Sequence, residues 1–251
     1  MGAPVATLIG HPGSPFVRKV LAACAFKNLE VAVDPIVAFI GNDEFAELSP
    51  LRRIPVWIDE EVVIPDSSAI LQYLEERWPE PSLLPATPAG RARCRWLEEY
   101  ADTRLADVLV WKLYFQVVVK PFVLGEAPDE ALVAQARDEE VPEVFDFLER
   151  QLPEAGFLFG APSIADLTLA AHFANARWAG VEPDPVRWPH LNAWLERVHT
   201  QTPLGALNRA AARLMKVPPP EQREILPRLG LIPSARSWAG GPPRRGPMSP
   251  R

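Results

Sequence analysis

The side chain best placed to do chemistry near the start of the chain is the hydroxyl of Ser14, which is followed directly by Pro15. Serine is a preferred N-cap residue and proline is favoured in the first helical turn, so the pair predicts a helix beginning at Pro15. The apolar run 5–9 before it is typical of a strand. A turn between strand and helix aims backbone N–H groups and the positive end of the helix dipole at a bound anion. The alternative is a serine that only caps its own helix.

The elements that must position this turn follow closely in the sequence. Residues 31–33 predict a second short strand, and residues 56–58 and 62–64 predict a hairpin around a polar turn. Asp66 and Ser67 then begin a helix whose apolar residues lie at helical spacing. The predicted order is therefore strand, helix, strand, a polar stretch with room for a short helix, hairpin and helix.

Three stretches in this order resemble a known family. Residues 11–21 (HPGSPFVRKVL), 49–55 (SPLRRIP) and 66–70 (DSSAI) resemble the catalytic stretch, the cis-proline segment and the acidic-Ser-x-Ala-Ile element of the serine-type glutathione transferases. A fourth stretch, 157–166 (FLFGAPSIAD), is similar to the element that begins the central helix of the family's second domain. The resemblance covers residues 5–215. It implies an α/β thioredoxin-like N-terminal domain followed by an all-α helical-bundle C-terminal domain.

The resemblance implies that Ser14 acts on the thiol of glutathione, the co-substrate. A cysteinyl thiol has a pKa of about 8.5, so only a small fraction is thiolate, the nucleophilic form, at neutral pH. A hydrogen bond from the Ser14 hydroxyl and the dipole of the following helix would stabilise the thiolate without a base. His11 is not expected to act as that base, because no third residue is evident to orient it.

The resemblance also implies partners for the rest of the tripeptide. Ile54, placed before a cis Pro55, would offer its backbone N–H and C=O to the cysteinyl main chain. Ser67 would bind the γ-glutamyl carboxylate and Asp66 the γ-glutamyl ammonium. Arg53 would meet the glycyl carboxylate. The plain alternatives are that Asp66 and Ser67 only cap a helix and that Arg53 is solvated.

Two features depart from the family pattern. The loop 41–44 (GNDE) is acidic where related sequences often carry Lys or His for the glycyl carboxylate, which predicts weaker binding of glutathione. Arg52 stands where many relatives have Gly. Redox-active relatives carry Cys where Ser14 stands, and because serine cannot form a mixed disulfide, thiol-transfer chemistry is disfavoured.

Prolines predict the domain boundaries. Residues 78–88 hold four prolines, which neither a helix interior nor a strand tolerates. We therefore predict a glutathione-binding domain over 1–78, a linker over 79–88 and an all-helical domain over 89–216. Residues 217–251 are rich in Pro, Gly and Arg, a composition that predicts a disordered tail.

The second domain is predicted to be helical throughout, with a capping box formed by Ser163 and Asp166. Its predicted helices cover 91–119, 129–152, 163–179, 189–200 and 204–215. The first of them carries Trp111, Tyr114 and Phe115 at roughly helical spacing. These aromatic side chains either line the pocket for an electrophile or belong to the core.

The composition fits a cytoplasmic globular enzyme. The chain has 251 residues, of which 48% are hydrophobic, enough for one or two domains with sizeable cores. The net charge of −6 argues against nucleic-acid and membrane-surface partners, and no apolar run is long enough to span a bilayer. Cys24 and Cys94 fall within predicted helices and suggest neither a disulfide framework nor a metal site. A homodimer is expected from the family resemblance alone.

These observations predict a serine-type glutathione transferase, a detoxification enzyme that joins the glutathione thiolate to small, largely apolar electrophiles. Two alternatives stay open. One is a non-catalytic binding or interaction module that keeps the fold. The other is a glutathione-dependent dehalogenase, peroxidase or isomerase that uses the same glutathione half-site.

Overall fold

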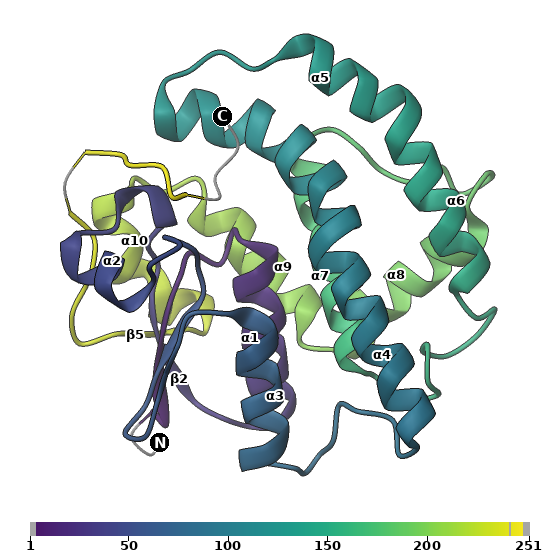
Figure 1. The fold of residues 1–251 in the computed structure, drawn as a ribbon, viewed down its shortest axis with the longest axis horizontal. Helices are drawn as coiled ribbons and strands as arrows, with labels where there is room; N and C mark the ends of the chain where they lie inside the picture. The colour runs from purple at the N-terminus through teal and green to yellow at the C-terminus, as the bar shows by residue number, and fades with distance from the viewer. Residues whose placement is uncertain (1–3, 241, 248–251) are drawn as a thin grey trace. The chain divides into compact units, whose positions relative to one another are not determined.

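The computed structural model describes residues 4–240 and 242–247, and the chain folds into two compact units (Figure 1). The first unit, Met1–Pro81 with Ala206–Arg251, contains a sheet, and the second, Ser82–Gly205, is helical. This mixed-sheet unit and this helical unit confirm the predicted fold class. The chain returns to the first unit at Ala206, whereas the sequence places residues up to 216 in the second domain.

The sheet of the first unit has five strands within the described residues, in the order β4-β3-β1-β2-β5. β1 pairs in parallel with β2 and antiparallel with β3, which in turn pairs antiparallel with β4. Leu8, Ile9 and Val33 are fully buried, as expected of the apolar runs that predicted these strands. The strands are β1 (Ala6–Ile9), β2 (Val31–Asp34), β3 (Val56–Ile58), β4 (Val63–Ile64) and β5 (Ile232–Pro233).

Two helices of the first unit lie side by side next to the sheet: α1 begins at the predicted Pro15 and α3 at the predicted Ser67 (Figure 1). Their far ends are joined by Lys27, whose buried ammonium lies 2.8 Å from the Glu75 carboxylate. The same ammonium donates to the carbonyl of Trp78 at 2.7 Å, so this buried charge is fully engaged. The helical elements are α1 (Pro15–Phe26), a 3₁₀ turn (Ala38–Ile40), α2 (Asp43–Leu48) and α3 (Ser67–Arg77).

The C-terminal segment, defined as residues 217–240 and 242–247, is folded onto the first unit. It follows α9 (Leu204–Leu214) and contains α10 (Gln222–Ile225), flanked by 3₁₀ turns at Pro219–Glu221 and Leu226–Leu229. Its β5 pairs in parallel with β2. The predicted disordered tail over 217–251 is therefore wrong for this segment, while positions 241 and 248–251 lie outside the described residues.

Trp238 shows why the C-terminal segment is ordered. Its side chain is only 5% exposed and packs in a core cluster with Ile9 and Val56 of the sheet, Ile36 of the loop after β2 and Phe45 of α2. Its backbone N–H donates to the Asp34 carboxylate at 2.7 Å, and the Ser237 hydroxyl donates to the same carboxylate at 2.8 Å. Apolar burial and these bonds to a buried acceptor outweigh the Pro- and Gly-rich composition.

The second unit is built around α7 (Ile164–Trp178), which is buried along most of its length. Ser163 and Asp166 form the predicted capping box at its start, with the Ser163 N–H donating to the Asp166 carboxylate at 3.0 Å. The indole N–H of Trp194 donates to the same carboxylate at 2.8 Å, and burial raises the pKa of Asp166. This element is structural, as the sequence indicates.

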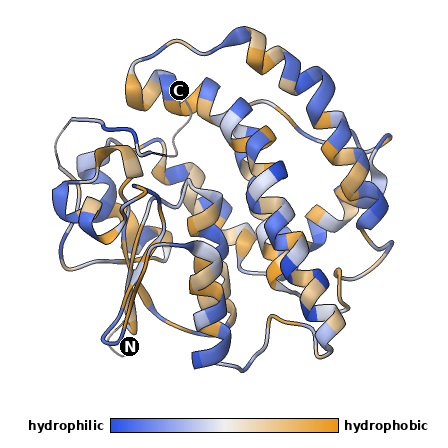
Figure 2. Ribbon diagram, in the orientation of Figure 1, coloured by the Kyte–Doolittle hydropathy of each residue, from blue (hydrophilic) through white to orange (hydrophobic). Residues whose placement is uncertain are grey.

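The longer helices around α7, which are α4 (Pro88–Tyr100), α6 (Val141–Gln151) and α8 (Pro189–Gln201), bury one face each. α4 and α6 show hydrophobic and hydrophilic residues side by side in Figure 2, and the buried residues of α6 include Val144, Phe145 and Leu148. The helical elements are α4 (Pro88–Tyr100), α5 (Glu130–Gln135), α6 (Val141–Gln151), α7 (Ile164–Trp178) and α8 (Pro189–Gln201), with π-helical stretches at Ala101–Leu105, Asp107–Leu124 and Ala136–Glu140. The predicted helix 91–119 thus continues to Leu124.

Candidate functional site

Ser14 lies at the N-cap position of α1, with the extended backbone (φ −77°, ψ 130°) that a cap residue adopts. Among the described residues, no backbone N–H group of α1 donates a hydrogen bond to the Ser14 hydroxyl. The Ser14 side chain is partly exposed. The structure therefore excludes the alternative that Ser14 only caps its own helix. The hydroxyl thus stands at the positive end of the α1 dipole, where an anion is favoured.

His11 stabilises the turn that leads into Ser14 by accepting two backbone hydrogen bonds within the turn. The Gly13 N–H donates to Nδ1 of His11 at 2.8 Å, and the Ser14 N–H donates to the His11 carbonyl at 2.9 Å. His11 is 6% exposed, and burial, reinforced by the charge of Arg18, lowers its pKa to about 4. A hydrogen bond to Gln222 acts in the opposite direction. His11 is thus a neutral imidazole that is engaged in hydrogen bonds, and its exclusion as a general base stays a prediction.

The Ile54–Pro55 peptide bond is cis, as the resemblance implies. This segment lies against the strand end that precedes the Ser14 turn, because a Cβ on Gly10 would come within 3.2 Å of the Ile54 Cβ. Ser49 holds the segment from the other side: its hydroxyl accepts from the Arg53 N–H and donates to the Arg53 carbonyl, both at 2.9 Å. The Arg53 side chain is exposed.

Asp66 and Ser67 begin α3, as predicted. The Asp66 carboxylate accepts from the Ala69 N–H at 2.9 Å, so the capping role of Asp66 is present. Ser67 is buried with 7% of its surface exposed. The adjacent Ser68 accepts at 3.2 Å from the ammonium of Lys19, a buried residue of α1. This bond ties the start of α3 to the first turns of α1, the helix that carries Ser14 at its N-cap.

The acidic loop 41–44 is covered by arginines of the C-terminal segment. Arg244 lies 2.6 Å from the Asp43 carboxylate, and Arg236 pairs with Glu44. Both arginines lie in the stretch that the sequence assigned to a disordered tail, so their role was missed. The signal that could have found them is the basic charge of the last residues beside the acidic charge of this loop. The loop is therefore not the uncompensated acidic patch that the sequence indicates.

Arg52 occupies the left-handed region with φ +50°, where glycine is favoured. This explains why Gly suits the position in related sequences. The Arg52 guanidinium donates to the Gly41 carbonyl at 2.6 Å and lies over the Phe45 ring at 5.8 Å. These two contacts offset the cost of the backbone conformation and fix the cis-proline segment to the acidic loop.

The three aromatic candidates for an electrophile pocket have different environments. Phe115 is 1% exposed, so its ring belongs to the core of the second unit. Trp111 packs edge-on against it with ring centroids 5.8 Å apart, and Tyr114 packs against Trp178 at 5.9 Å. Trp111 and Tyr114 keep part of their surface exposed. Of the three, these two are left as candidates to contact a ligand.

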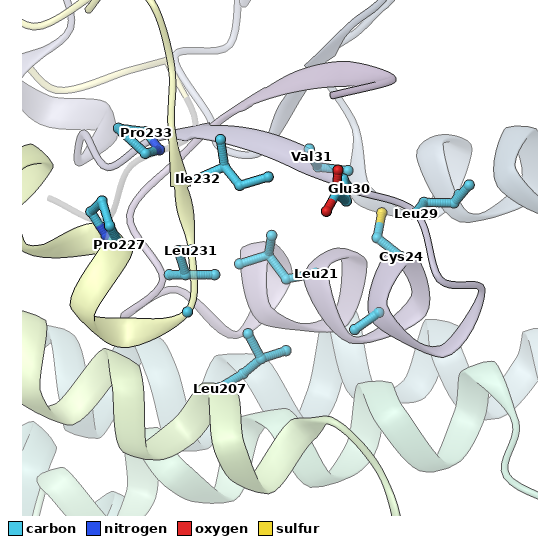
Figure 3. Close-up of a pocket in the computed structure, with 12 residues that line it drawn as sticks. Leu21, Cys24, Leu29, Glu30, Val31, Leu207, Pro227, Leu231, Ile232 and Pro233 are labelled. Atoms are coloured by element: carbon cyan, nitrogen blue, oxygen red, sulfur yellow. The ribbon is translucent and has the colours of Figure 1, made fainter. Parts of the chain in front are cut away.

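A separate pocket of about 500 Å³ lies in the first unit between α1, β2 and the C-terminal segment (Figure 3). Apart from the Cys24 thiol and the Glu30 carboxylate, its walls are apolar. Burial raises the pKa of Cys24 to about 12, so its thiol stays protonated. None of the predicted site residues lines this pocket. The other lining residues are Leu21, Ala25, Leu29, Val31, Leu207, Pro227, Gly230, Leu231, Ile232 and Pro233.

Two kinds of feature are absent from the residues that the structure describes. No helix among them is long and apolar enough to cross a membrane. They also include no group of three or more His, Cys, Asp or Glu side chains that could hold a metal ion.

Comparison with known proteins gives consistent matches. The family model of the glutathione S-transferase N-terminal domain matches residues 8–82, and that of the C-terminal domain matches residues 96–197. The chain is 30% identical over 220 residues to glutathione S-transferase 3 of Zea mays, which covers 85% of this chain and 96% of the relative. It is also 30% identical over 182 residues to FtsZ-localized protein A of Caulobacter vibrioides, covering 70% and 79%. A glutathione transferase homologue from Drosophila mojavensis, solved with bound glutathione, matches with a TM-score of 0.67 and 25% identity, covering 84% and 94%.

Proposed function

Because this chain belongs to the glutathione S-transferase superfamily, we propose that it binds glutathione and joins the glutathione thiolate to small, largely apolar electrophiles, with Ser14 stabilising the thiolate. The observation that carries the proposal is the Ser14 hydroxyl, which stands at the N-terminus of α1 and is not used to cap it. The relative from Drosophila mojavensis, solved with bound glutathione, supports the choice of co-substrate.

The chemistry needs a stabilised thiolate and no base. A hydrogen bond from the Ser14 hydroxyl to the sulfur and the positive end of the α1 dipole both favour the charged form. A lowering of the thiol pKa by one unit corresponds to about 1.4 kcal/mol, which one charge-assisted hydrogen bond can supply. The thiol proton leaves to solvent. The sulfur then forms a bond to the electrophilic carbon, whose leaving group departs with its electron pair.

The remaining groups of glutathione are assigned to the segments that flank Ser14. The backbone of Ile54 pairs with the cysteinyl main chain. Ser67, at the N-terminus of α3, takes the γ-glutamyl carboxylate, and the exposed Asp66 carboxylate takes the ammonium. The exposed Arg53 side chain meets the glycyl carboxylate. Trp111 and Tyr114 contact the electrophile.

The ultraviolet absorbance of the glutathione thiolate, titrated against pH in the presence of the protein, tests this function. We expect the pKa of the bound thiol to lie at least about one unit below its free value and to return toward it in Ser14→Ala. The matched control is Ser82→Ala, which removes an exposed hydroxyl in the second unit and should leave the titration unchanged. No binding, or an unshifted thiol in the wild-type protein, would overturn the proposal.

A second candidate is a non-catalytic interaction module, which the similarity to FtsZ-localized protein A favours. It predicts a protein that flows through a glutathione resin and fails the thiolate titration. A glutathione-dependent dehalogenase, peroxidase or isomerase predicts retention on the resin and the same thiolate, but turnover of a halide, a hydroperoxide or a double-bond isomer. A panel of these acceptors separates the enzyme classes.

We also propose that the protein works as a homodimer in the cytoplasm. The family membership supports both points. Sedimentation equilibrium would show a mass of two chains, and a monomer at all concentrations would contradict the dimer.

A further inference from the structure

The turn that presents Ser14 is linked to the C-terminal segment through one chain of hydrogen bonds. Gln222 of α10 is 6% exposed, and its side-chain Nε2 donates to the carbonyls of Leu214 at 3.3 Å and Val217 at 3.0 Å. Both amide hydrogens are therefore used at the end of α9. The Oε1 atom of Gln222 remains as an acceptor, and the Gln222 side chain bonds to the His11 imidazole.

The two outer groups of this network, the Gly13 N–H and the Gln222 amide, decide which atom of the His11 ring donates and which accepts. Nδ1 of His11 accepts the Gly13 N–H at 2.8 Å, so Nδ1 carries no hydrogen. The hydrogen of the neutral ring is then on Nε2, and it donates to the remaining acceptor of Gln222. An amide fixed by two carbonyls thus selects the tautomer of His11. That tautomer is the only neutral one that can accept from Gly13.

The space around Gly13 leaves little freedom for another arrangement. A Cβ on Gly13 would lie 2.8 Å from Nδ1 of His11 and 3.4 Å from the sulfur of Met215, which follows α9. Arg18, which is fully buried, donates to the Pro12 carbonyl at 2.8 Å and holds the same turn from the side of α1. The backbone that leads into Ser14 is therefore enclosed by the end of α9 and by α1.

We propose that Gln222 and His11 are positioning residues for the Ser14 hydroxyl, because their hydrogen bonds to each other and to the Gly13 N–H fix the turn from which Ser14 projects. This inference rests on the role of Ser14 proposed above. It gives the C-terminal segment a part in thiolate stabilisation, although Gln222 itself touches no substrate. A hydroxyl held in one place stabilises a thiolate better than a mobile one, because no ordering is needed when the charge forms.

Two substitutions of His11 separate its bond with the Gly13 N–H from its bond with Gln222. His11→Asn places an oxygen near the position of Nδ1 and keeps an acceptor for Gly13, whereas His11→Gln places its amide nitrogen near Nε2 and keeps only the donor to Gln222. We expect His11→Gln to raise the pKa of the bound thiol toward the value in Ser14→Ala and to lower kcat about tenfold, with KM for glutathione little changed. His11→Asn should stay closer to the wild type in both quantities.

Gln222→Leu tests the other end, and Gln116→Leu is its matched control. Gln116 is also a buried glutamine, 2% exposed, but it belongs to the second unit, where it accepts from the Asp129 N–H. Both leucine variants should lower the melting temperature. Only Gln222→Leu should raise the pKa of the bound thiol, in the same direction as His11→Gln.

The outcomes are distinguishable from failure of the proposed function. A wild-type protein without a lowered thiol pKa overturns the function and this inference with it. A wild-type protein with a lowered pKa that Gln222→Leu and His11→Gln leave in place, while both variants melt earlier, shows that these residues only stabilise the fold and overturns the inference alone.

Discussion

Replacing Trp238 by alanine should destabilise the first unit strongly, although this residue lies close to the end of the chain. The side chain is 5% exposed and fills the cluster between the sheet and α2, and the Arg236 guanidinium lies 4.2 Å from its ring centroid. Truncation of a buried tryptophan costs about 3–5 kcal/mol, because apolar contact is lost and a cavity is left. For a chain of this length, each kcal/mol corresponds to about 2–4 °C, so the melting temperature should fall by about 6–20 °C.

Differential scanning calorimetry is the suitable assay, because the two units can give separate transitions. Phe122→Ala is the control: Phe122 is 83% exposed in the second unit, and its removal should change the stability by no more than about 0.5 kcal/mol. A Trp238→Ala protein that melts within a degree or so of the wild type would refute the packing of the C-terminal segment and restore the disordered tail.

Two further predictions concern charge. The pKa of His11 is about 4 in the folded protein against an ordinary 6.5, so the folded state binds fewer protons than the unfolded state between these two pH values. His11 should therefore contribute about 3 kcal/mol to the free energy of unfolding. This contribution is fully present above pH 6.5 and is lost as the pH falls toward 4. Urea unfolding at a series of pH values across this range measures the contribution. If the free energy of unfolding depends on pH in the same way in His11→Asn as in the wild type, the prediction is contradicted. Arg244→Glu places a like charge beside Asp43. Because both side chains are exposed, the free energy of unfolding should fall by less than about 1 kcal/mol, and this loss of stability should fade in about 1 M salt. A loss insensitive to salt would show that packing, rather than charge, holds this contact.

The parts of the fold that the sequence predicts are those set by local chemistry. Ser14 and Pro15 mark the start of α1, Asp66 marks the start of α3, and the Ser163 capping box marks the start of α7. In each case neighbouring residues decide the backbone, so a short window of sequence contains the answer. The cis bond before Pro55 could be expected only from the family resemblance, because isomer choice depends on surrounding contacts.

The parts that the sequence missed depend on residues far apart in the chain. The order of the C-terminal segment comes from bonds such as that between Trp238 and Asp34, which are 204 positions apart. The charge of the acidic loop is balanced by Arg244, and His11 is held by Gln222. Composition describes a segment by itself, so it cannot report a partner that lies in another part of the sequence.

The outer strands of the sheet have a consequence for association between molecules. β4 and β5, which lie at the two edges, are each only two residues long, and β5 ends in Pro233, which has no N–H to offer a further strand. Open backbone at an edge is the usual template for unwanted cross-pairing and aggregation. Here both edges are too short or too blocked to recruit a neighbour. Two copies that associate must therefore meet through side-chain surfaces and not by extending the sheet.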